Sequence, residues 1–280
     1  MTAGPVLVTG AGGLLGAAAA ADPRAHGLTR AALDITDPDA ISRALDRHRP
    51  VAVLNCAAEA RVDAAAVDPA ATHRINAEAP GHLAVACARA GVRCVHVSTD
   101  YVLHGPDVPG HRLRPADRPA PRGVYAESKQ AGEARALAAG AVVVRVQWVY
   151  AWVGRGFFAA ALERLRSGAP LRLVIDQVGV PSPAPWVAAR LLDACAPGGP
   201  TGLFHLAPDG EATAWDWIAL GAAVAGVSLA GAHPARRADF GGAPRPARSV
   251  LDSTTFFQAF GGAAPRWEAA LCAAAPRAHP

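Results

Sequence analysis

The chain has 280 residues, is 51% hydrophobic and carries a formal net charge of +4. This length and apolar content suffice for one large domain, or for a domain with a smaller lobe. The positive charge comes from scattered arginines without a basic block, so we expect no nucleic-acid partner.

Composition also bounds the compartment in which the chain works. No stretch of eighteen apolar residues is free of charge, so no membrane span is expected. The glycine-rich loop starts at position 10 with no basic region or cleavage site before it, so we expect no signal peptide. The five cysteines show no metal-binding spacing and are interpreted as free core thiols of a cytoplasmic protein. They are Cys56, Cys87, Cys94, Cys195 and Cys272.

The first predicted element is a short apolar strand, Pro5–Thr9, which leads into a glycine-rich loop and an alanine-rich helix. The apolar run is typical of a strand buried on both faces. Glycines at positions 10, 13 and 16 let the backbone approach a pyrophosphate closely, and the helix N-terminus offers N–H groups to the anion. The pattern indicates a dinucleotide-binding turn, and a glycine-rich turn without a ligand is the alternative.

The second strand is expected to end near Leu28–Arg30. An arginine after this strand suits the 2′-phosphate of NADP, whereas an acidic residue suits the 2′-hydroxyl of NAD. Arg30 therefore favours NADPH, with NADH as the alternative cofactor and an ordinary surface arginine as the alternative interpretation. Asp34 and Ile35 are expected to flank the adenine, and Asp37 to cap the next helix.

Further strands are predicted at 51–55, 94–98, 142–146 and 202–206, alternating with helical stretches that include 215–225. This alternation predicts an α/β fold, a Rossmann-like doubly wound parallel sheet with a smaller C-terminal substrate-binding lobe. Residues 1–150 would form the dinucleotide-binding domain, with later elements around 170–206 returning to it, and 151–280 mainly the substrate-binding lobe. Residues 104–123 are expected to form a loop over the site, and the last residues of the chain to be disordered.

Lys129 is the single lysine of the chain, and it lies four positions after Tyr125, one of only three tyrosines. Residues i and i+4 share one face of a helix, so the ammonium is expected to reach the phenol. Because every other non-histidine base is arginine, a chance pairing is improbable, and the two residues are candidates for proton transfer.

Several ordered motifs share this arrangement with a known family. They are Ser98–Val102, the Tyr125–Lys129 pair, Trp148–Tyr150, Asp176–Pro181, Gly202–Leu206 and Ser249–Asp252. Together they resemble the dTDP-4-dehydrorhamnose reductase family, a branch of the extended short-chain dehydrogenases/reductases, from residue 5 to about residue 272. The resemblance implies NADPH-dependent reduction of the 4-keto group of a dTDP-4-keto-6-deoxyhexose in deoxysugar biosynthesis. A small-molecule nucleotide sugar would be the partner, and a homodimer is compatible with the sequence.

The resemblance also implies roles for individual residues. Tyr125 would donate a proton to the carbonyl oxygen, Thr99 would hydrogen-bond that oxygen, and Lys129 would hold the nicotinamide ribose. A free phenol has a pKa of about 10, and Lys129 and the oxidised nicotinamide are expected to lower the pKa of Tyr125. The sugar side would comprise Thr99, Asp100, Tyr101, Tyr125 and Trp148. The cofactor side would comprise Gly10, Gly12, Gly13, Leu14, Leu15, Gly16, Arg30, Asp34, Ile35, Asn55, Ala57, Ala58, Asn76, Ser98, Tyr125, Lys129 and Val149.

Alternatives remain open for some of these residues. Trp148, Tyr101 and Tyr150 could pack in the core, and Asn55, Ala57 and Asn76 could be scaffold, with Asn76 holding a helix bend. Glu59 and Arg61 depart from the family pattern and are expected to bear on sugar specificity. Ala66 stands where an acid is frequent in the family, so no metal is predicted.

Two other functions share this fold. A sugar-nucleotide dehydratase or epimerase is one, although Tyr101 stands where the dehydratase branch has its second carboxylate. An NADP-binding regulatory subunit is the other, although such a protein has no need of Thr99, Tyr125 and Lys129.

Overall fold

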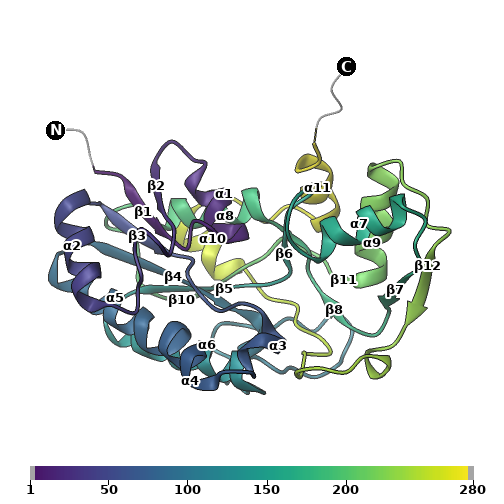
Figure 1. The fold of residues 1–280 in the computed structure, drawn as a ribbon, viewed down its shortest axis with the longest axis horizontal. Coiled ribbons are helices and arrows are strands. Elements are labelled where there is room, and N and C mark those ends of the chain that lie inside the picture. The colour runs from purple at the N-terminus through teal and green to yellow at the C-terminus, as the bar shows by residue number, and fades with distance from the viewer. Residues whose placement is uncertain (1–3, 277–280) are drawn as a thin grey trace.

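The computed structural model describes residues 4–276, and its centre is a six-stranded parallel sheet (Figure 1). The strands lie in the order β10-β5-β4-β3-β1-β2, and every pairing is parallel. They are β1 (Val6–Thr9), β2 (Ala25–Leu28), β3 (Ala52–Asn55), β4 (Arg93–Thr99), β5 (Val142–Val146) and β10 (Gly202–Leu206). The chain moves from β1 to β2 on one side and then to β3 on the other, which makes a doubly wound sheet whose order reverses between β1 and β3.

Helices cover both faces of this sheet (Figure 1). One face carries α1 (Leu14–Ala20), α8 (Ala184–Ala194) and α10 (Thr254–Phe260), and the other carries α2 (Pro38–His48), α5 (Ala79–Arg89) and α6 (Val124–Ala138). Side chains alternate between the two cores along each strand: Val6 and Val8 pack with α1 and α8, whereas Leu7 packs with α2 and α5. The uninterrupted apolar runs of the sequence therefore reflect burial on both faces.

A smaller lobe lies beside the sheet and has its own core around Phe158, Trp217 and Ile218 (Figure 1). Its helices are α7 (Phe157–Arg166), α9 (Ala214–Val224) and α11 (Trp267–Ala273), and its short strands pair as β6–β9, β7–β12 and β8–β11. These strands are β6 (Val149–Tyr150), β7 (Leu171–Val174), β8 (Val178–Gly179), β9 (Ser182–Pro183), β11 (Ala212–Thr213) and β12 (Ala232–Ala235). Short helices α3 (Val62–Ala65) and α4 (Pro69–His73) follow β3, and single 3-10 turns span Asp100–Val102 and Arg237–Asp239.

The predicted elements match the observed ones closely. Strands 142–146 and 202–206 have the predicted bounds, and α9 begins one residue before its predicted start, capped by Thr213 and Asp216. Asp37 caps α2 as expected, accepting from the N–H groups of Asp39 and Ala40. Segment 104–123 has no helix or strand, and its one bridge joins Leu113 to Leu251. The expected disorder of the last residues concerns 277–280, which lie outside the described residues.

One prediction about the cysteines needs correction. All five are free, but only Cys87, Cys94 and Cys195 are buried, while Cys56 is half-buried and Cys272 is exposed on α11. Within residues 4–276, no helix combines the length and the apolarity that crossing a bilayer requires.

Candidate active site

The glycine-rich loop follows β1 at the point where the strand order reverses. Gly10 has a φ of +70°, and a Cβ on it would lie 2.6 Å from the backbone nitrogen of Ala57. A Cβ on Gly16 would lie 2.2 Å from the carbonyl oxygen of Gly10, so only glycine lets α1 start this close to the loop. Gly12 and Gly13 are exposed, and no side chain caps α1. Its first N–H groups are therefore free for an anion.

The residues predicted to contact the cofactor next to the glycine-rich loop differ in their exposure to solvent. Leu14 and Leu15 are half-buried in the first turn of α1, and Leu15 packs on the sheet core. Beyond β2, the Arg30 side chain is 77% exposed and lies 3.5 Å from Asp34. Hydrogen bonds from Thr36 hold the pKa of Asp34 below its ordinary value. Ile35 is buried, so it packs in the core beneath this edge.

Asn55 and Asn76 are both buried, and their amides are bound by protein groups. Asn55 Oδ1 accepts from Thr9 Oγ1 at 2.6 Å and from the N–H of Ala57 at 3.1 Å. Asn76 accepts from the N–H of Glu59 at 2.9 Å and donates to its carbonyl at 3.0 Å. It lies in a π-helical turn, Arg74–Glu78, as expected of a residue that holds a helix bend. These bonds favour the scaffold interpretation of both residues, while Ala57 is half-buried and Ala58 exposed at the edge.

Tyr125 and Lys129 lie in the first turns of α6, but their polar ends point to different partners. The Lys129 ammonium, 3% exposed, donates to the carbonyl of Val97 at 2.7 Å and lies 3.4 Å from His96 Nε2. β4 supplies both partners of the ammonium, and among the described residues no hydrogen bond joins it to the Tyr125 phenol. That the ammonium can reach the phenol stays a prediction.

The acid–base properties of this pair follow from burial. Burial lowers the pKa of Lys129 to about 8, and the nearby Glu133 carboxylate opposes this shift. Burial raises the pKa of Tyr125 to about 12, and the Thr99 hydroxyl acts in the opposite direction. The expected lowering of the phenol pKa by Lys129 is not found in the protein alone, because burial is the largest influence and Lys129 is not among the groups that shift this pKa.

The end of β4 brings Ser98, Thr99, Asp100 and Tyr101 to the same edge of the sheet. Thr99 Oγ1 donates to Asp100 Oδ1 at 3.2 Å, and Ser249 Oγ donates to Asp100 Oδ2 at 2.5 Å. Asp100 is only 2% exposed, and burial raises its pKa to about 6 despite these hydrogen bonds. Asp100 is therefore buried and bound by Thr99 and Ser249, while the sugar-side role predicted for it stays a prediction.

Two of the aromatic residues predicted for the sugar side, Tyr101 and Trp148, have different neighbours. The rings of Tyr101 and Tyr125 meet edge to face with centroids 5.5 Å apart. Trp148 is half-buried and has a φ of +40°, a region that non-glycine residues occupy at a cost of roughly 1–3 kcal/mol. Its indole lies over Gly179, where a Cβ would approach Cε2 to 2.5 Å. Val149 is half-buried in β6, and Tyr150 is buried against Phe158, as its core alternative predicted.

The charged residues that depart from the family pattern are paired. Glu59 and Arg61 form an ion pair at 2.6 Å, and Asp63 pairs with Arg245 of the smaller lobe at 2.8 Å. The Asp63–Arg245 pair joins α3 to the segment before Ser249. Glu59 and Arg61, the residues expected to bear on sugar specificity, therefore neutralise each other.

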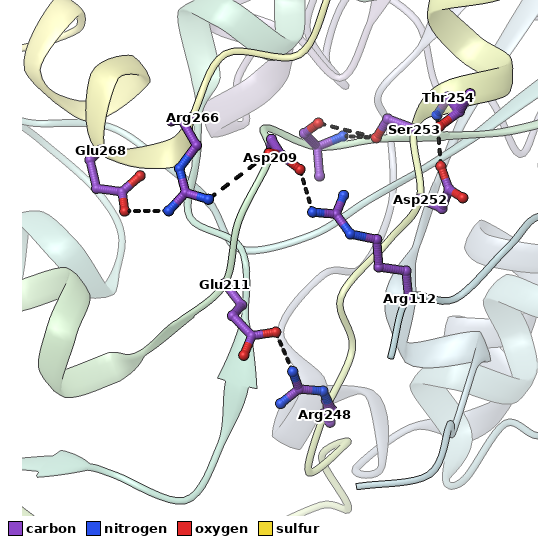
Figure 2. Close-up of polar contacts among 10 residues, drawn as sticks. Arg112, Asp209, Glu211, Arg248, Asp252, Ser253, Thr254, Arg266 and Glu268 are labelled. Carbon is purple, nitrogen blue, oxygen red and sulfur yellow. Dashed lines mark hydrogen bonds and ion pairs between the residues drawn. The ribbon is translucent and has the colours of Figure 1, made fainter. Parts of the chain in front are cut away.

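A second polar cluster fastens the C-terminal segments to the turn after β10 (Figure 2). Asp209 pairs with Arg112 and with Arg266, and Glu211 pairs with Arg248. Ser253 also bonds the backbone of Ala207. Because the arginines and carboxylates of this cluster pair with one another, we assign the cluster a structural role.

Sequence reasoning missed a group of buried polar residues beneath α6. His96, Arg145 and His205 lie on β4, β5 and β10, and Arg145 donates to both oxygens of Glu133 at 2.8 and 2.7 Å. His205 lies 3.3 Å from Arg145 and 3.0 Å from the carbonyl of Leu113. A signal was present, since each of these three residues interrupts an otherwise apolar strand. Such an interruption in a doubly buried strand implies a polar partner across the sheet.

Comparisons with known proteins give consistent similarities. The family model for the RmlD substrate binding domain matches residues 4–278. The chain is 41% identical to a dTDP-4-dehydrorhamnose reductase of Mycobacterium tuberculosis, over 96% of this chain and 91% of that protein. It is 34% identical to a dTDP-4-keto-6-deoxy-D-glucose reductase of Streptomyces niveus, over 96% of each. The crystal structure of dTDP-4-dehydrorhamnose reductase from Bacillus anthracis in complex with NADP superposes with a TM-score of 0.89, at 26% identity, over 96% of this chain and 98% of that one.

Proposed function

Because the chain belongs to the dTDP-4-dehydrorhamnose reductase family, we propose that it reduces the 4-keto group of a dTDP-4-keto-6-deoxyhexose with NADPH. One observation carries the proposal. Thr99 is the last residue of β4, and Tyr125 lies close to it, at the same carboxyl edge of the sheet where the glycine-rich loop follows β1. Ligands of doubly wound sheets bind at this edge.

The residues of the edge fit a dinucleotide. Gly10 and Gly16 let the loop pack against the backbone of Ala57 and against itself, where a Cβ would collide, so the loop stays close to the start of α1. Arg30 is exposed beyond β2, where it suits a 2′-phosphate. The Bacillus anthracis relative, solved with NADP, supports the same preference. Asp34, with its lowered pKa, is an acceptor for a ribose hydroxyl and keeps NADH as the second cofactor. The cofactor supplies the hydride that reduces the sugar carbon.

The protein's own residues would supply and direct the proton. With its pKa raised to about 12, Tyr125 keeps its proton at neutral pH and can donate it to the oxygen that gains charge during reduction. Thr99 lies close enough to Tyr125 to lower the pKa of its phenol against the effect of burial, and Asp100 accepts a hydrogen bond from the Thr99 hydroxyl. Tyr101 and Trp148 would line the sugar, with Trp148 in the connection between β5 of the sheet and β6 of the smaller lobe.

We further propose that residues 1–150, with β10 returning to their sheet, bind the cofactor, and that most of 151–280 binds the sugar. Free cysteines fit a protein of the reducing cytoplasm. Tyr101 disfavours the dehydratase alternative, since it follows Asp100 at the position where a second carboxylate would be needed, and Asp100 itself is buried.

The first test follows loss of NADPH absorbance with purified protein and a series of dTDP-4-keto-6-deoxyhexoses. Tyr125→Phe should lower kcat by ~10²–10⁴ while NADPH still binds. Tyr150→Phe is the matched control, because its hydroxyl is buried without a partner among the described residues, and it should keep wild-type turnover. Equal rates for Tyr125→Phe and the wild type would refute the proposal, and NADPH binding without turnover of any such sugar would favour the regulatory alternative.

The cofactor preference has its own test. Arg30→Ala should weaken NADPH binding by roughly tenfold and leave NADH binding unchanged, because only NADPH carries the 2′-phosphate. Arg43→Ala removes an exposed arginine that lies on α2 and should change the affinity for neither NADPH nor NADH. An equal loss for both cofactors with Arg30→Ala would contradict the assignment.

A further inference from the structure

A chain of buried hydrogen-bonding groups connects the end of β1 to Lys129. Thr9 Oγ1 donates to Asn55 Oδ1 at 2.6 Å, and Asn55 Nδ2 lies 3.0 Å from His96 Nδ1. His96 Nε2 in turn lies 3.4 Å from Lys129 Nζ. All four side chains are at least nine-tenths buried, so water does not compete for these contacts.

The backbone of Ala57 fixes which atoms of this chain donate. Its N–H can only donate, and it points at Asn55 Oδ1 from 3.1 Å, so that atom is the amide oxygen. The amide NH₂ of Asn55 therefore faces His96 Nδ1. An amide NH₂ has no lone pair to offer, so Nδ1 must accept and carries no proton. A neutral His96 then carries its proton on Nε2, the nitrogen that faces Lys129.

This tautomer treats the two forms of Lys129 differently. An ammonium has three donors and no acceptor, so it leaves the Nε2–H of His96 buried without a partner. A neutral amine has a lone pair that accepts this proton donor, and it can still donate to the carbonyl of Val97 at 2.7 Å. A buried donor without a partner is costly, and the neutral amine avoids that cost.

We propose that His96 is a positioning residue for Lys129: Asn55 holds its imidazole as the Nε2–H tautomer, which favours the neutral amine over the ammonium. Lys129 then yields a proton more readily than an ordinary lysine and can take part in restoring the proton that Tyr125 gives up in each turnover. This role rests on the proposed function, whereas the tautomer itself does not.

The other titratable groups around Lys129 also affect the equilibrium between its ammonium and its neutral amine. Glu133 favours the ammonium, but its carboxylate is held by Arg145 at 2.7 Å. Although Cys56 as a whole is half-buried, desolvation of its thiol raises the pKa to about 12, so the thiol stays neutral. Burial, followed by the charge of Lys129, holds the pKa of His96 well below its ordinary value, so His96 does not become the charged member. The burial of Lys129 itself lowers its pKa to about 8, in the direction that the tautomer also favours.

The tautomer can be observed directly in the full-length protein with NADP⁺ bound. Imidazole nitrogen–proton correlation spectra of ¹⁵N-histidine-labelled protein distinguish a protonated ring nitrogen from one with a lone pair, and His96→Gln identifies the His96 signals. We expect a proton on Nε2 and a lone pair on Nδ1 from pH 6 to pH 9. A proton on Nδ1, or an imidazolium at pH 6, would overturn the proposal, and this result depends neither on turnover nor on the stability of any other variant.

The effect on Lys129 is tested by the pH profile. In His96→Leu the Nε2–H donor that faces Lys129 is removed without adding charge, so the ammonium no longer leaves a buried donor without a partner. A glutamine would not test this, because the Asn55 NH₂ would bind its oxygen and turn its own NH₂ toward Lys129. The alkaline limb of kcat/KM should then move upward by about one pH unit, the scale of one hydrogen bond to a charged group. His205→Leu is the matched control, since it removes another buried histidine of the same sheet face that bonds Arg145 and Leu113 but not Lys129. An unmoved limb in His96→Leu, or an equal shift in both variants, would refute the role.

A failure of the proposed function can be told apart from a failure of this inference. If no sugar is reduced, the same two variants are compared by the pH dependence of NADPH binding, followed by nicotinamide fluorescence. An upward shift confined to His96→Leu would then support the positioning role without any turnover. Identical binding profiles for both variants and the wild type would refute it.

Discussion

Replacing Glu133 by glutamine should be among the most destabilising single changes in the protein. Arg145 and Glu133 are 1% and 3% exposed, and two hydrogen bonds of 2.8 and 2.7 Å join them. Glu133→Gln keeps the shape but leaves the guanidinium charge buried without an anion, which costs about 3–5 kcal/mol. A domain's whole folding free energy is roughly 5–15 kcal/mol, so the loss should be plain in urea unfolding followed by circular dichroism.

Two companion variants separate the buried charge from other effects. Glu163→Gln removes an acid from an exposed ion pair, in which the Glu163 side chain is 76% exposed, and should cost at most ~1 kcal/mol. Glu133→Leu combined with Arg145→Met removes both buried charges and should recover most of the loss. A cost below ~1 kcal/mol for Glu133→Gln alone would refute the reasoning, because it would mean that water reaches the guanidinium.

Three further predictions concern the site. Ser249→Ala removes a donor to the Asp100 carboxylate, whose pKa is about 6. The variant should lose ~1–2 kcal/mol more stability at pH 8, where Asp100 is charged, than at pH 4, where it is protonated. Equal losses in urea unfolding at both pH values would contradict this hydrogen bond. Gly179→Ala should displace Trp148, raising KM for the sugar at least several-fold with NADPH affinity unchanged, and a wild-type KM would argue against Trp148 as a sugar contact. Gly16→Ala places a Cβ 2.2 Å from a loop carbonyl oxygen and should weaken NADPH binding tenfold or more in a fluorescence titration, whereas unchanged affinity would show that the loop can shift.

Local patterns explain why much of the fold could be predicted. The apolar runs at 142–146 and 202–206 coincide with β5 and β10 because doubly buried strands need continuous apolar sequence. The spacing of Gly10 and Gly16 encodes a contact within seven residues. Information of this kind lies within a few positions of each residue.

The direction of the Lys129 side chain could not be predicted in the same way. The helical spacing correctly places Tyr125 and Lys129 on one helix, but the carbonyl of Val97 and the ring of His96 decide where the ammonium lies. Likewise, Asp100 is bound by Ser249, 149 positions away. A one-dimensional period carries no information on such partners, although a histidine inside a buried strand signals that one exists.

The bridge between Leu113 and the C-terminal segment has a consequence for synthesis. The N–H of Leu113 donates to the carbonyl of Val250 at 2.7 Å, and its carbonyl accepts from Asp252 at 2.8 Å. During translation, Tyr125 and Lys129 leave the ribosome well before Val250 and Asp252 are made. Until then the N–H and carbonyl of Leu113 lack their backbone partners, and Asp100 lacks the Ser249 hydroxyl. Such long-range closure is a late and slow event in folding. A chain terminated before position 249 would carry every predicted catalytic residue and still lack the segment that assembles them, so activity should be gained only when the polypeptide is nearly finished.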